Sequence, residues 1–144
     1  MKNILIIGDK GYVGSLLNKY LKNKKKLNVV GIDNHYFNSS TNNKKKKLIK
    51  TDCRNFQINK LKVIPDAIIY LSAVSNDPMG KKYKSATEQI NFKACIKIAK
   101  DAKKYRVKKF IFASSCSMYG ASGNSLKKEN DILQPLTDYA KSKV

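Results

Sequence analysis

The sequence is short of cysteine, has no tryptophan and contains no long hydrophobic run. Its three cysteines, Cys53, Cys95 and Cys116, show neither CxxC spacing nor a pairing pattern, which argues against a disulfide framework and a structural metal site and favours a reducing cytosol. No apolar stretch approaches the length that a bilayer-spanning helix needs. The apolar run near the N-terminus ends at Gly8, too early for the h-region of a signal peptide. These absences predict a cytoplasmic protein without a membrane segment.

Acidic residues and arginine are also scarce. Ten aspartates and glutamates stand against 30 basic residues, which gives a formal net charge of +20. Such a charge by itself indicates binding to nucleic acid or to an anionic membrane. Only Arg54 and Arg106 are arginines, however, and the lysines are scattered over the sequence without clustered aromatic residues. Because Lys, Asn and Ile are the residues that an AT-rich genome favours, we interpret the charge as a solvated lysine surface and keep a charge-driven nucleic-acid binder as the weaker alternative.

One strand, turn and helix at residues 3–21 organise the sequence. The continuous apolar run at residues 4–7 is typical of a strand that is covered on both faces of a parallel sheet. Three glycines in the spacing GxxGxxG follow it, where a tight turn, close approach to a phosphate and close helix packing exclude side chains. The amides that begin the helix favour an anion such as a dinucleotide pyrophosphate. The glycines are Gly8, Gly11 and Gly14, and the helix should pack on the strand through Val13, Leu16, Leu17, Tyr20 and Leu21.

An acidic residue closes the second predicted strand, at residues 27–32. Asp33 lies about 20 residues beyond the glycines, where a carboxylate can accept both ribose hydroxyls of the adenosine half of a dinucleotide. The next residues are Asn34, His35 and Tyr36, so no arginine follows to bind a 2′-phosphate, and the carboxylate would repel one. The sequence therefore predicts NAD rather than NADP, with an aspartate that merely caps a strand as the alternative.

The rest of the chain alternates between strands and helices, which predicts an α/β protein with a Rossmann-type, doubly wound parallel sheet and right-handed crossovers. Further strands are expected at residues 48–50, 67–71 and 110–113, an irregular helix at 56–64, a long helix at 82–105 and a last helix at 138–144; loops are expected at 34–47, 72–80 and 116–135. The long helix should bury a stripe made of Ala86, Ile90, Ala94, Ile98 and Ala102.

Two stretches late in the chain carry candidate catalytic groups, SSCSMYG at residues 114–120 and YAKSK at residues 139–143. Tyr139 and Lys143 are four residues apart, which places them on one face of a helix. A phenol is a poor base at neutral pH, and a neighbouring ammonium group and a cationic nicotinamide ring stabilise its ionised form. A serine at the end of the fifth strand can then hold the substrate oxygen. YxxxK alone is common on solvated helix faces. It is stronger evidence for a catalytic pair here because it follows the glycine turn and Asp33 in the sequence.

Taken together, these motifs resemble the extended short-chain dehydrogenase/reductase family, in particular the NAD-dependent nucleotide-sugar epimerases and dehydratases that are similar to UDP-glucose 4-epimerase. The resemblance covers the whole chain. It rests on GDKGYVG at 8–14, DN at 33–34, DCRN at 52–55, LSA at 71–73, Asn91, SSCSMYG at 114–120 and YAKSK at 139–143.

The resemblance implies a role for each of these motifs. Gly11, Tyr12 and Val13 would lie against the pyrophosphate, Asp33 and Asn34 would hold the adenosine ribose, Asp52 and Cys53 would flank the adenine, and Leu71, Ser72 and Ala73 would line the path to the nicotinamide. Ser115 would be the catalytic hydroxyl, Tyr139 the acid and base, Lys143 its ribose-binding partner, and Asn91 would steady the site. A polar residue at the margin of the buried stripe is the alternative for Asn91, and small buried side chains are the alternative for Cys53 and Cys116.

The implied reaction is transient oxidation of a nucleotide-sugar. Tyr139 would take the proton of a sugar hydroxyl, commonly at C4, while hydride passes to NAD, and the ketone would then be reduced or handed on. The 4,6-dehydratases of the family carry Thr-Asp-Glu where this chain has Ser115, Cys116 and Ser117. The missing carboxylates favour epimerisation or simple oxidoreduction over dehydration.

Family members continue well beyond the YxxxK motif, whereas this sequence stops one residue after Lys143. The resemblance therefore implies that residues 1–144 form an incomplete NAD(P)-binding Rossmann domain from which the C-terminal substrate domain is absent. The fifth strand is then expected to be an exposed apolar edge. Three explanations stay open: a truncated product, one half of an enzyme completed by a second chain, and a non-catalytic NAD-binding module. The resemblance also implies a homodimer through the helices at 82–105 and 138–144.

Overall fold

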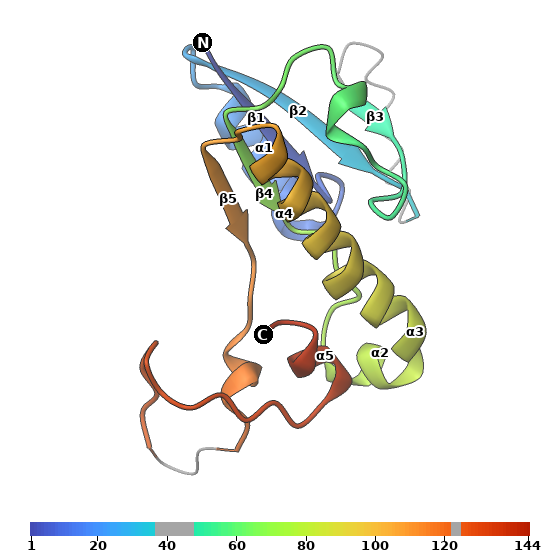
Figure 1. Ribbon diagram of the computed structural model, residues 1–144, viewed down its shortest axis with the longest axis vertical. Helices are drawn as coiled ribbons and strands as arrows, with labels where there is room; N and C mark the ends of the chain where they lie inside the picture. The colour runs from blue at the N-terminus through green and yellow to red at the C-terminus, as the bar shows by residue number, and fades with distance from the viewer. Residues whose placement is uncertain (37–47, 122–124) are drawn as a thin grey trace.

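A computed structural model describes residues 1–36, 48–121 and 125–144 and contains one parallel sheet of five strands (Figure 1). The strand order is β3-β2-β1-β4-β5, so the chain winds in one direction from β1 to β3 and in the other from β4 to β5. The strands are β1 (Lys2–Ile7), β2 (Leu27–Asp33), β3 (Leu48–Lys50), β4 (Ala67–Tyr70) and β5 (Lys109–Phe112). The Rossmann-type parallel sheet and all five predicted strands are confirmed. Most of the loop predicted at 34–47 lies outside the described residues.

The helical segments differ more from the prediction. They are α1 (Tyr12–Lys22), η1 (Ile58–Lys60), α2 (Asp77–Lys82), α3 (Lys84–Thr87), η2 (Glu88–Ala94), α4 (Cys95–Lys104), η3 (Cys116–Tyr119) and α5 (Asp138–Lys141). The helix predicted at 56–64 is wrong apart from the single turn η1, because Val63 and Ile64 stay exposed and give no apolar face for a longer helix.

The loop predicted at 72–80 is also too long. Asn76 begins α2 inside it by accepting a hydrogen bond from the backbone N–H of Met79, as helix-capping residues do. The predicted long helix is not continuous either: Tyr83, at φ −120° and ψ 51°, separates α2 from α3, and η2 is a wider π-helical turn before α4. At the other end of the chain, α5 ends at Lys141 rather than at residue 144.

The main hydrophobic core lies between the sheet and α4, which crosses in front of the strands in Figure 1. Ala94, Ile98 and Ala102 of the predicted stripe are buried there, while Ala86 and Ile90 are only half-buried. Thr87 and Asn91 take the inward positions near η2, because a π-helical turn shifts the phase of the buried face. The core comprises Leu5, Ile7, Ile32, Cys53, Phe56, Ile58, Ile68, Tyr70, Ala94, Cys95, Ile98 and Ala102.

Helix α1 covers the opposite face of the sheet, but not with the predicted stripe. Val13, Leu16 and Tyr20 are 58%, 58% and 59% exposed, so the prediction that they pack on the strand is wrong. Gly14 and Asn18 face the sheet instead, with Leu17 and Leu21 half-buried beside them. The reason is the turn before the helix: a side chain at position 14 would overlap the backbone of Gly8, so the helix makes its closest approach at this glycine.

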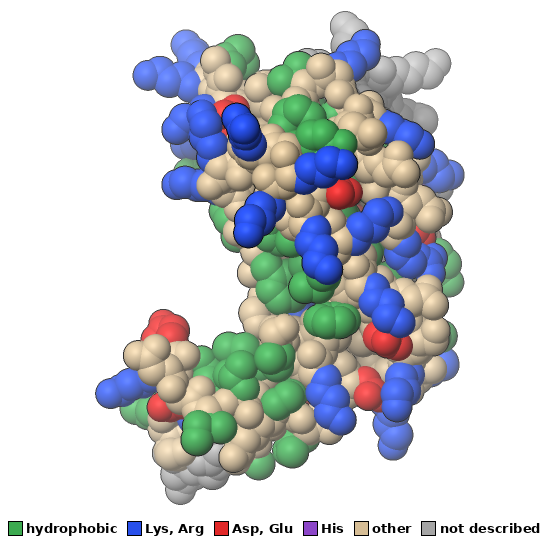
Figure 2. Space-filling view, in the orientation of Figure 1, with side chains coloured by type: hydrophobic (Ala, Val, Ile, Leu, Met, Phe, Trp, Pro, Cys, Tyr) green, Lys and Arg blue, Asp and Glu red, His purple; other side chains and the backbone are tan. Residues whose placement is uncertain are grey.

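Lysine and arginine side chains are spread over the face of the molecule shown in Figure 2. Within the described ranges, none of the helices combines the length and the apolar character needed to cross a membrane.

Candidate cofactor and catalytic site

The glycine turn lies at the carboxyl end of β1 and shows why two of its glycines are required. Gly8 has φ +88°, and a Cβ there would lie 2.7 Å from the backbone nitrogen of Ser72. A side chain at Gly14 would overlap the carbonyl of Gly8. Gly11 precedes α1 and is exposed, so the first amides of this helix face open space above the turn. The turn can therefore accept an anion at the start of an 11-residue helix.

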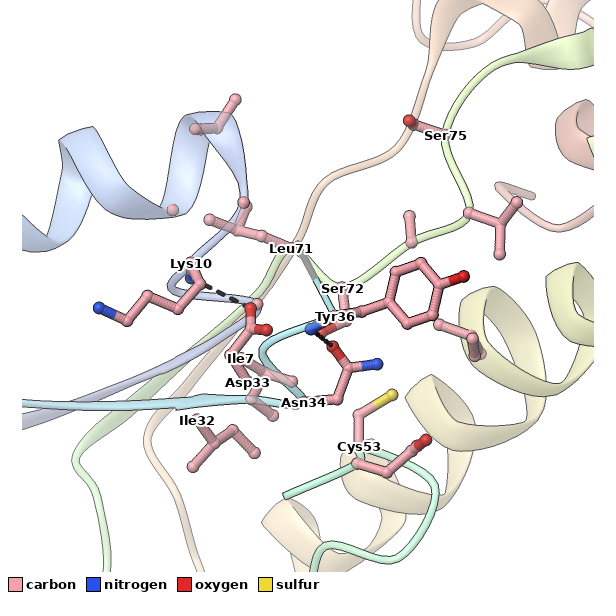
Figure 3. A pocket seen from close by; sticks show the side chains of 18 of the residues that line it. Ile7, Lys10, Ile32, Asp33, Asn34, Tyr36, Cys53, Leu71, Ser72 and Ser75 are labelled. Carbon is pink, nitrogen blue, oxygen red and sulfur yellow. Dashed lines mark hydrogen bonds between the residues drawn. The ribbon is translucent and has the colours of Figure 1, made fainter. Parts of the chain in front are cut away.

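Asp33 is fixed at the edge of the same turn (Figure 3). Its Oδ2 accepts a hydrogen bond of 3.0 Å from the backbone N–H of Lys10. Its Oδ1 accepts one of 2.8 Å from the N–H of His35. The neighbouring Asn34 accepts a hydrogen bond of 3.0 Å from the N–H of Tyr36. Two backbone donors thus hold the carboxylate in place, and its remaining lone pairs can accept further hydrogen bonds from a ligand.

A pocket of about 770 Å³ opens above the carboxyl ends of β1, β2 and β4. It also has lining residues that the sequence analysis did not single out, among them Lys10, Tyr36, Met79 and Tyr83. Lys10 lies within the glycine motif and Tyr36 directly after Asn34, whereas Met79 lies on α2 and Tyr83 directly after it, in a region that the sequence analysis did not connect with the cofactor. The predicted cofactor-contacting residues that line the pocket are Gly8, Gly11, Tyr12, Val13, Gly14, Asp33, Asn34, Asp52, Cys53, Leu71, Ser72 and Ala73.

The far wall of the pocket carries an ion pair. Arg54 Nη2 lies 2.7 Å from Asp52 Oδ2, and Arg54 Nη1 donates a hydrogen bond of 2.9 Å to Gln89 Oε1. The Arg54 guanidinium therefore holds the pKa of the Asp52 carboxyl below its ordinary value. Because Arg54 belongs to the DCRN motif, the sequence could have indicated that it lies at the pocket. The sequence gave no sign of its bonds to Asp52 and Gln89.

The three cysteines are free and differ in their surroundings. Cys53 is 7% exposed, accepts a hydrogen bond of 3.5 Å from the hydroxyl of Tyr70, and has its pKa raised by burial. It therefore fits the reading of a small buried side chain. Cys116 is exposed, so the interpretation of a small buried side chain is wrong for Cys116.

Asn91 joins three segments that are distant in the sequence. Its Oδ1 accepts a hydrogen bond of 2.8 Å from the N–H of Val74, and its Nδ2 donates to the carbonyl of Val74 and to Oγ of Ser142, both at 3.0 Å. The side chain is only 1% exposed. The amide thus ties the loop after β4, which lines the pocket, to the segment that carries Tyr139.

Tyr139 and Lys143 lie close together, as their spacing predicts. Nζ of Lys143 is 5.7 Å from the centre of the Tyr139 ring and 5.0 Å from that of Phe112. The same Nζ donates a hydrogen bond of 3.0 Å to the carbonyl of Ala113. Lys143 is 5% exposed, and burial lowers the pKa of its ammonium group.

The serines after β5 have two different partners. Ser115 shares a hydrogen bond of 2.9 Å with Oγ of Ser117, whereas Ser114 donates one of 2.6 Å to the carbonyl of Lys143. Ser114, which the sequence did not single out, therefore fastens the end of the Tyr139 segment to the end of β5. Among the described residues, the pocket lining does not include Ser115, Asn91, Tyr139 or Lys143, so the structure shows two neighbouring groups rather than one continuous site.

Asp9 is a buried carboxylate inside the glycine turn that the sequence analysis also passed over. It is 4% exposed, and its Oδ2 accepts a hydrogen bond of 3.0 Å from Nδ2 of Asn18. Among the described residues, nothing donates a hydrogen bond to its Oδ1. Burial raises the pKa of this carboxyl, and the charge of Asp33 raises it further against the opposing effect of Lys10. A side chain at Gly31 would overlap the carboxylate, so this glycine makes room for it.

The sequence of this chain is similar to those of known proteins. Among curated proteins, the chain is 29% identical to an uncharacterized protein of Methanocaldococcus jannaschii and 28% identical to the uncharacterized UDP-glucose epimerase YtcB of Bacillus subtilis. These matches cover 99% and 98% of this chain but 48% of each relative. The chain therefore spans about half the length of the curated relatives that it matches.

Solved structures give a consistent result. The UDP-N-acetylglucosamine 4-epimerase from Methanobrevibacter ruminantium matches with a TM-score of 0.83 and 26% identity, over 99% of this chain and 47% of its own. The UDP-glucuronic acid 4-epimerase from Bacillus cereus, solved in complex with NAD, matches with a TM-score of 0.78 and 25% identity, over 98% and 48%. The model of the NAD dependent epimerase/dehydratase family matches residues 4–144, nearly the whole sequence. This chain belongs to the NAD dependent epimerase/dehydratase family.

Proposed function

We propose that this chain binds NAD in the pocket at the carboxyl ends of β1, β2 and β4, as the cofactor-binding part of a nucleotide-sugar epimerase or oxidoreductase. The observation that carries the proposal is the Asp33 carboxylate, held by two backbone N–H groups beside the glycine turn. The residues present fit a dinucleotide, because a side chain at Gly8 or Gly14 would overlap the backbone and the turn is left open at Gly11. The related enzyme from Bacillus cereus, whose structure contains NAD, supports this assignment.

The pocket lining suggests how each part of NAD would be held. Gly11, Tyr12 and Val13 would lie against the pyrophosphate at the start of α1, and Asp33 with Asn34 would accept hydrogen bonds from the adenosine ribose. The adenine would lie toward Asp52 and Cys53, on the side of the pocket that carries the Asp52–Arg54 ion pair. Leu71, Ser72 and Ala73 would lead toward the nicotinamide end.

The residues beyond this pocket have the chemistry for acid and base catalysis on a sugar hydroxyl. NAD supplies the hydride acceptor and donor when it is bound. The Tyr139 hydroxyl would take the proton of the sugar hydroxyl and return it, and the buried ammonium of Lys143, 5.7 Å from the ring, would stabilise the phenolate. Ser115 would hold the substrate oxygen, and Asn91 would fix the Tyr139 segment against the pocket. The names of relatives such as the UDP-glucose epimerase YtcB support a UDP-sugar as the substrate class.

A non-catalytic NAD-binding module is the second candidate. One observation favours it: Ser115, Tyr139 and Lys143 do not line the described pocket, and Ser115 bonds to Ser117 rather than to the Tyr139 hydroxyl. Both candidates predict NAD binding, and they differ only in turnover.

Calorimetric titration of the chain with NAD and NADP tests the binding proposal. The native chain should bind NAD with saturation and NADP more weakly. Asp33→Asn should weaken NAD binding about tenfold or more, because a hydrogen bond to a charged group contributes roughly 1.5–3 kcal/mol. The same variant should also reduce the ratio of NAD affinity to NADP affinity, since it removes the charge that repels a 2′-phosphate. Asp101→Asn, on α4 and away from the pocket, is the matched control. A folded chain that does not bind NAD would contradict the proposal.

Turnover separates the two candidates. The chain would be fused to the second half of YtcB, the part beyond the matched region, and assayed for interconversion of UDP-sugars. An enzyme should lose about 10²-fold or more of its rate in Tyr139→Phe, as expected when a general acid and base is removed, while still binding NAD. Tyr105→Phe, directly after α4 and outside the pocket lining, should keep the rate. NAD binding without turnover, although the same YtcB half is active with its own first half, would favour the non-catalytic module.

A further inference from the structure

The fold gathers basic residues at the amino ends of the strands, which is the end of the sheet opposite the cofactor pocket. Lys2 begins β1, residues 24–26 precede β2, and residues 103–109 run from the end of α4 into β5. These segments contain no aspartate or glutamate, and their basic side chains are all exposed. We call this set the basic end; it comprises Lys2, Lys24, Lys25, Lys26, Lys103, Lys104, Arg106, Lys108 and Lys109.

Hydrogen bonds between the strand ends hold these segments side by side. The N–H of Lys2 donates a hydrogen bond of 2.9 Å to the carbonyl of Lys26. On the other side of β1, the carbonyl of Asp66 accepts hydrogen bonds of 3.1 and 3.2 Å from the N–H groups of Lys108 and Lys109. Neighbouring strands lie about 4.8 Å apart, so the lysines at the starts of β2, β1 and β5 form a row about 15 Å long across the sheet.

The basic end keeps most of its positive charge. Nζ of Lys108 lies 3.4 Å from Oδ1 of Asp66, and the Lys108 side chain is still 78% exposed. In the part of the chain that the structure describes, no other member of the basic end forms an ion pair. Figure 2 shows lysine and arginine side chains gathered at the upper left, over the start of β5. Because like charges this close repel one another, a polyanion bound across them is favoured.

Two tyrosines lie among these lysines. Nζ of Lys24 is 4.5 Å from the centre of the Tyr20 ring, and Nζ of Lys104 is 5.6 Å from that of the Tyr105 ring. Tyr20 is 59% exposed, so a flat group can stack on its ring. Proteins that bind single-stranded nucleic acid combine these two features, because ammonium groups bind the phosphates and an unpaired base stacks on an aromatic ring.

We propose that the basic end binds single-stranded nucleic acid, with its lysines on the phosphates and Tyr20 stacked on a base. Lysine contacts the phosphate backbone as a point charge and does not read base edges, so the binding is independent of base sequence. The cofactor pocket opens at the other end of β1, a strand of six residues that spans about 20 Å. This function therefore goes beyond NAD binding and does not depend on it.

Fluorescence anisotropy with a labelled oligouridine tests the proposal. Saturable binding is expected, and log K should fall against log salt with a slope of about −3, because about four neutralised phosphates each contribute about −0.7. A basic-end variant should bind about tenfold or more weakly, whereas a control variant of equal net charge should bind within about twofold of the native chain. The basic-end variant carries Lys25→Gln, Lys26→Gln, Lys103→Gln and Lys104→Gln, and the control carries Lys81→Gln, Lys82→Gln, Lys127→Gln and Lys128→Gln, all at exposed positions.

Two further measurements examine the stacked base and the location of the site. Tyr20→Leu should weaken oligouridine binding about fivefold or more and leave the salt slope unchanged, because it removes a stacking surface and no charge. Phe92→Leu, at a 44% exposed position of η2, should have no effect. Saturating NAD should not displace the oligouridine, since the pocket lies at the other end of the strands.

Three results would overturn the proposal. Equal weakening in the basic-end variant and its control would show a general effect of net charge. Displacement of the oligouridine by NAD would place the binding in the cofactor pocket. Binding to phosphatidylserine vesicles that needs the four lysines, without binding to oligouridine, would assign the basic end to a membrane surface. A chain that binds oligouridine as expected but does not bind NAD would contradict the proposed function alone.

Discussion

Asn91 and Ser142, which lie 51 residues apart in the sequence, are joined by a hydrogen bond of 3.0 Å from Nδ2 to Oγ. The same Asn91 side chain also satisfies both backbone groups of Val74. Ser142 in turn donates a hydrogen bond of 2.7 Å to the carbonyl of Tyr139. One buried amide therefore connects η2, the pocket loop and α5, a helix of four residues that could not stand alone.

Replacing this amide should destabilise the chain. Asn91→Ala leaves buried partners in Val74 without hydrogen bonds and should lower the free energy of unfolding by about 3 kcal/mol, as measured by urea denaturation. Asn59→Ala, at an exposed position of η1, should change it by less than about 0.5 kcal/mol. Equal losses in the two variants would show that Asn91 has no special role in joining the segments.

The buried Asp9 carboxylate should make stability depend on pH. Because burial raises its pKa above 3.8, the folded chain holds this proton more tightly than the unfolded chain. The stability that Asp9 contributes is then complete below the pKa that it has in the unfolded chain. It is lost as the pH rises through the higher pKa that Asp9 has in the folded chain. Asp9→Asn should therefore become more stable than the native chain as the pH rises from about 4 to about 7.

The measurement is the difference in free energy of unfolding between Asp9→Asn and the native chain across this pH range. Taking the difference cancels the opposing effect of Asp52 and Asp66, whose pKa values are lowered by Arg54 and by the backbone N–H of Asn3. Asp101→Asn is the control on α4. A difference that stays constant with pH would mean that Asp9 titrates as it does in the unfolded chain.

Gly80 should be needed for the position of Tyr139. A Cβ at Gly80 would lie 2.8 Å from Cβ and 3.1 Å from the backbone nitrogen of Tyr139, so Gly80→Ala must push α5 away from α2. We expect a loss of about 1–3 kcal/mol in unfolding free energy and faster amide exchange in α5. Lys81→Ala, exposed on the same helix, should leave both unchanged. Unaltered exchange in Gly80→Ala would show that α5 docks independently of α2.

Thiol labelling should distinguish the three cysteines. Cys116 is exposed and should react rapidly with a disulfide reagent in the folded chain, whereas Cys53 and Cys95 are each 7% exposed. Burial also raises the pKa of Cys95 to about 11, which leaves little thiolate at neutral pH. One rapid equivalent should be counted before denaturation and three after it, and Cys116→Ser should remove the rapid one. More than one rapid thiol in the native state would contradict the described packing.

The strands and the cofactor pocket were largely predictable, because each rests on a local signal. Short apolar stretches, continuous at residues 4–7 and 67–71, indicated all five strands, and Asp33 with the glycine turn indicated where the pocket opens. The face that α1 presents was not predictable from periodicity, since it depends on the close approach of Gly14 to Gly8 across the turn. The continuous helix predicted at 82–105 also missed the break at Tyr83 and the π-helical turn that carries Asn91, whose side chain bonds to Ser142.

By itself, the sequence determined the parallel sheet, the approximate positions of the strands and the family, because apolar runs, glycine spacing and short motifs act over a few residues. The tertiary structure decided which groups meet. It buried Asp9 beside Asn18 and Gly31, joined Asn91 to Ser142, and turned Gly14 rather than Leu16 of α1 toward the sheet. These outcomes follow from the packing of segments that are distant in the chain, where one side chain's burial or exposure depends on what another element covers.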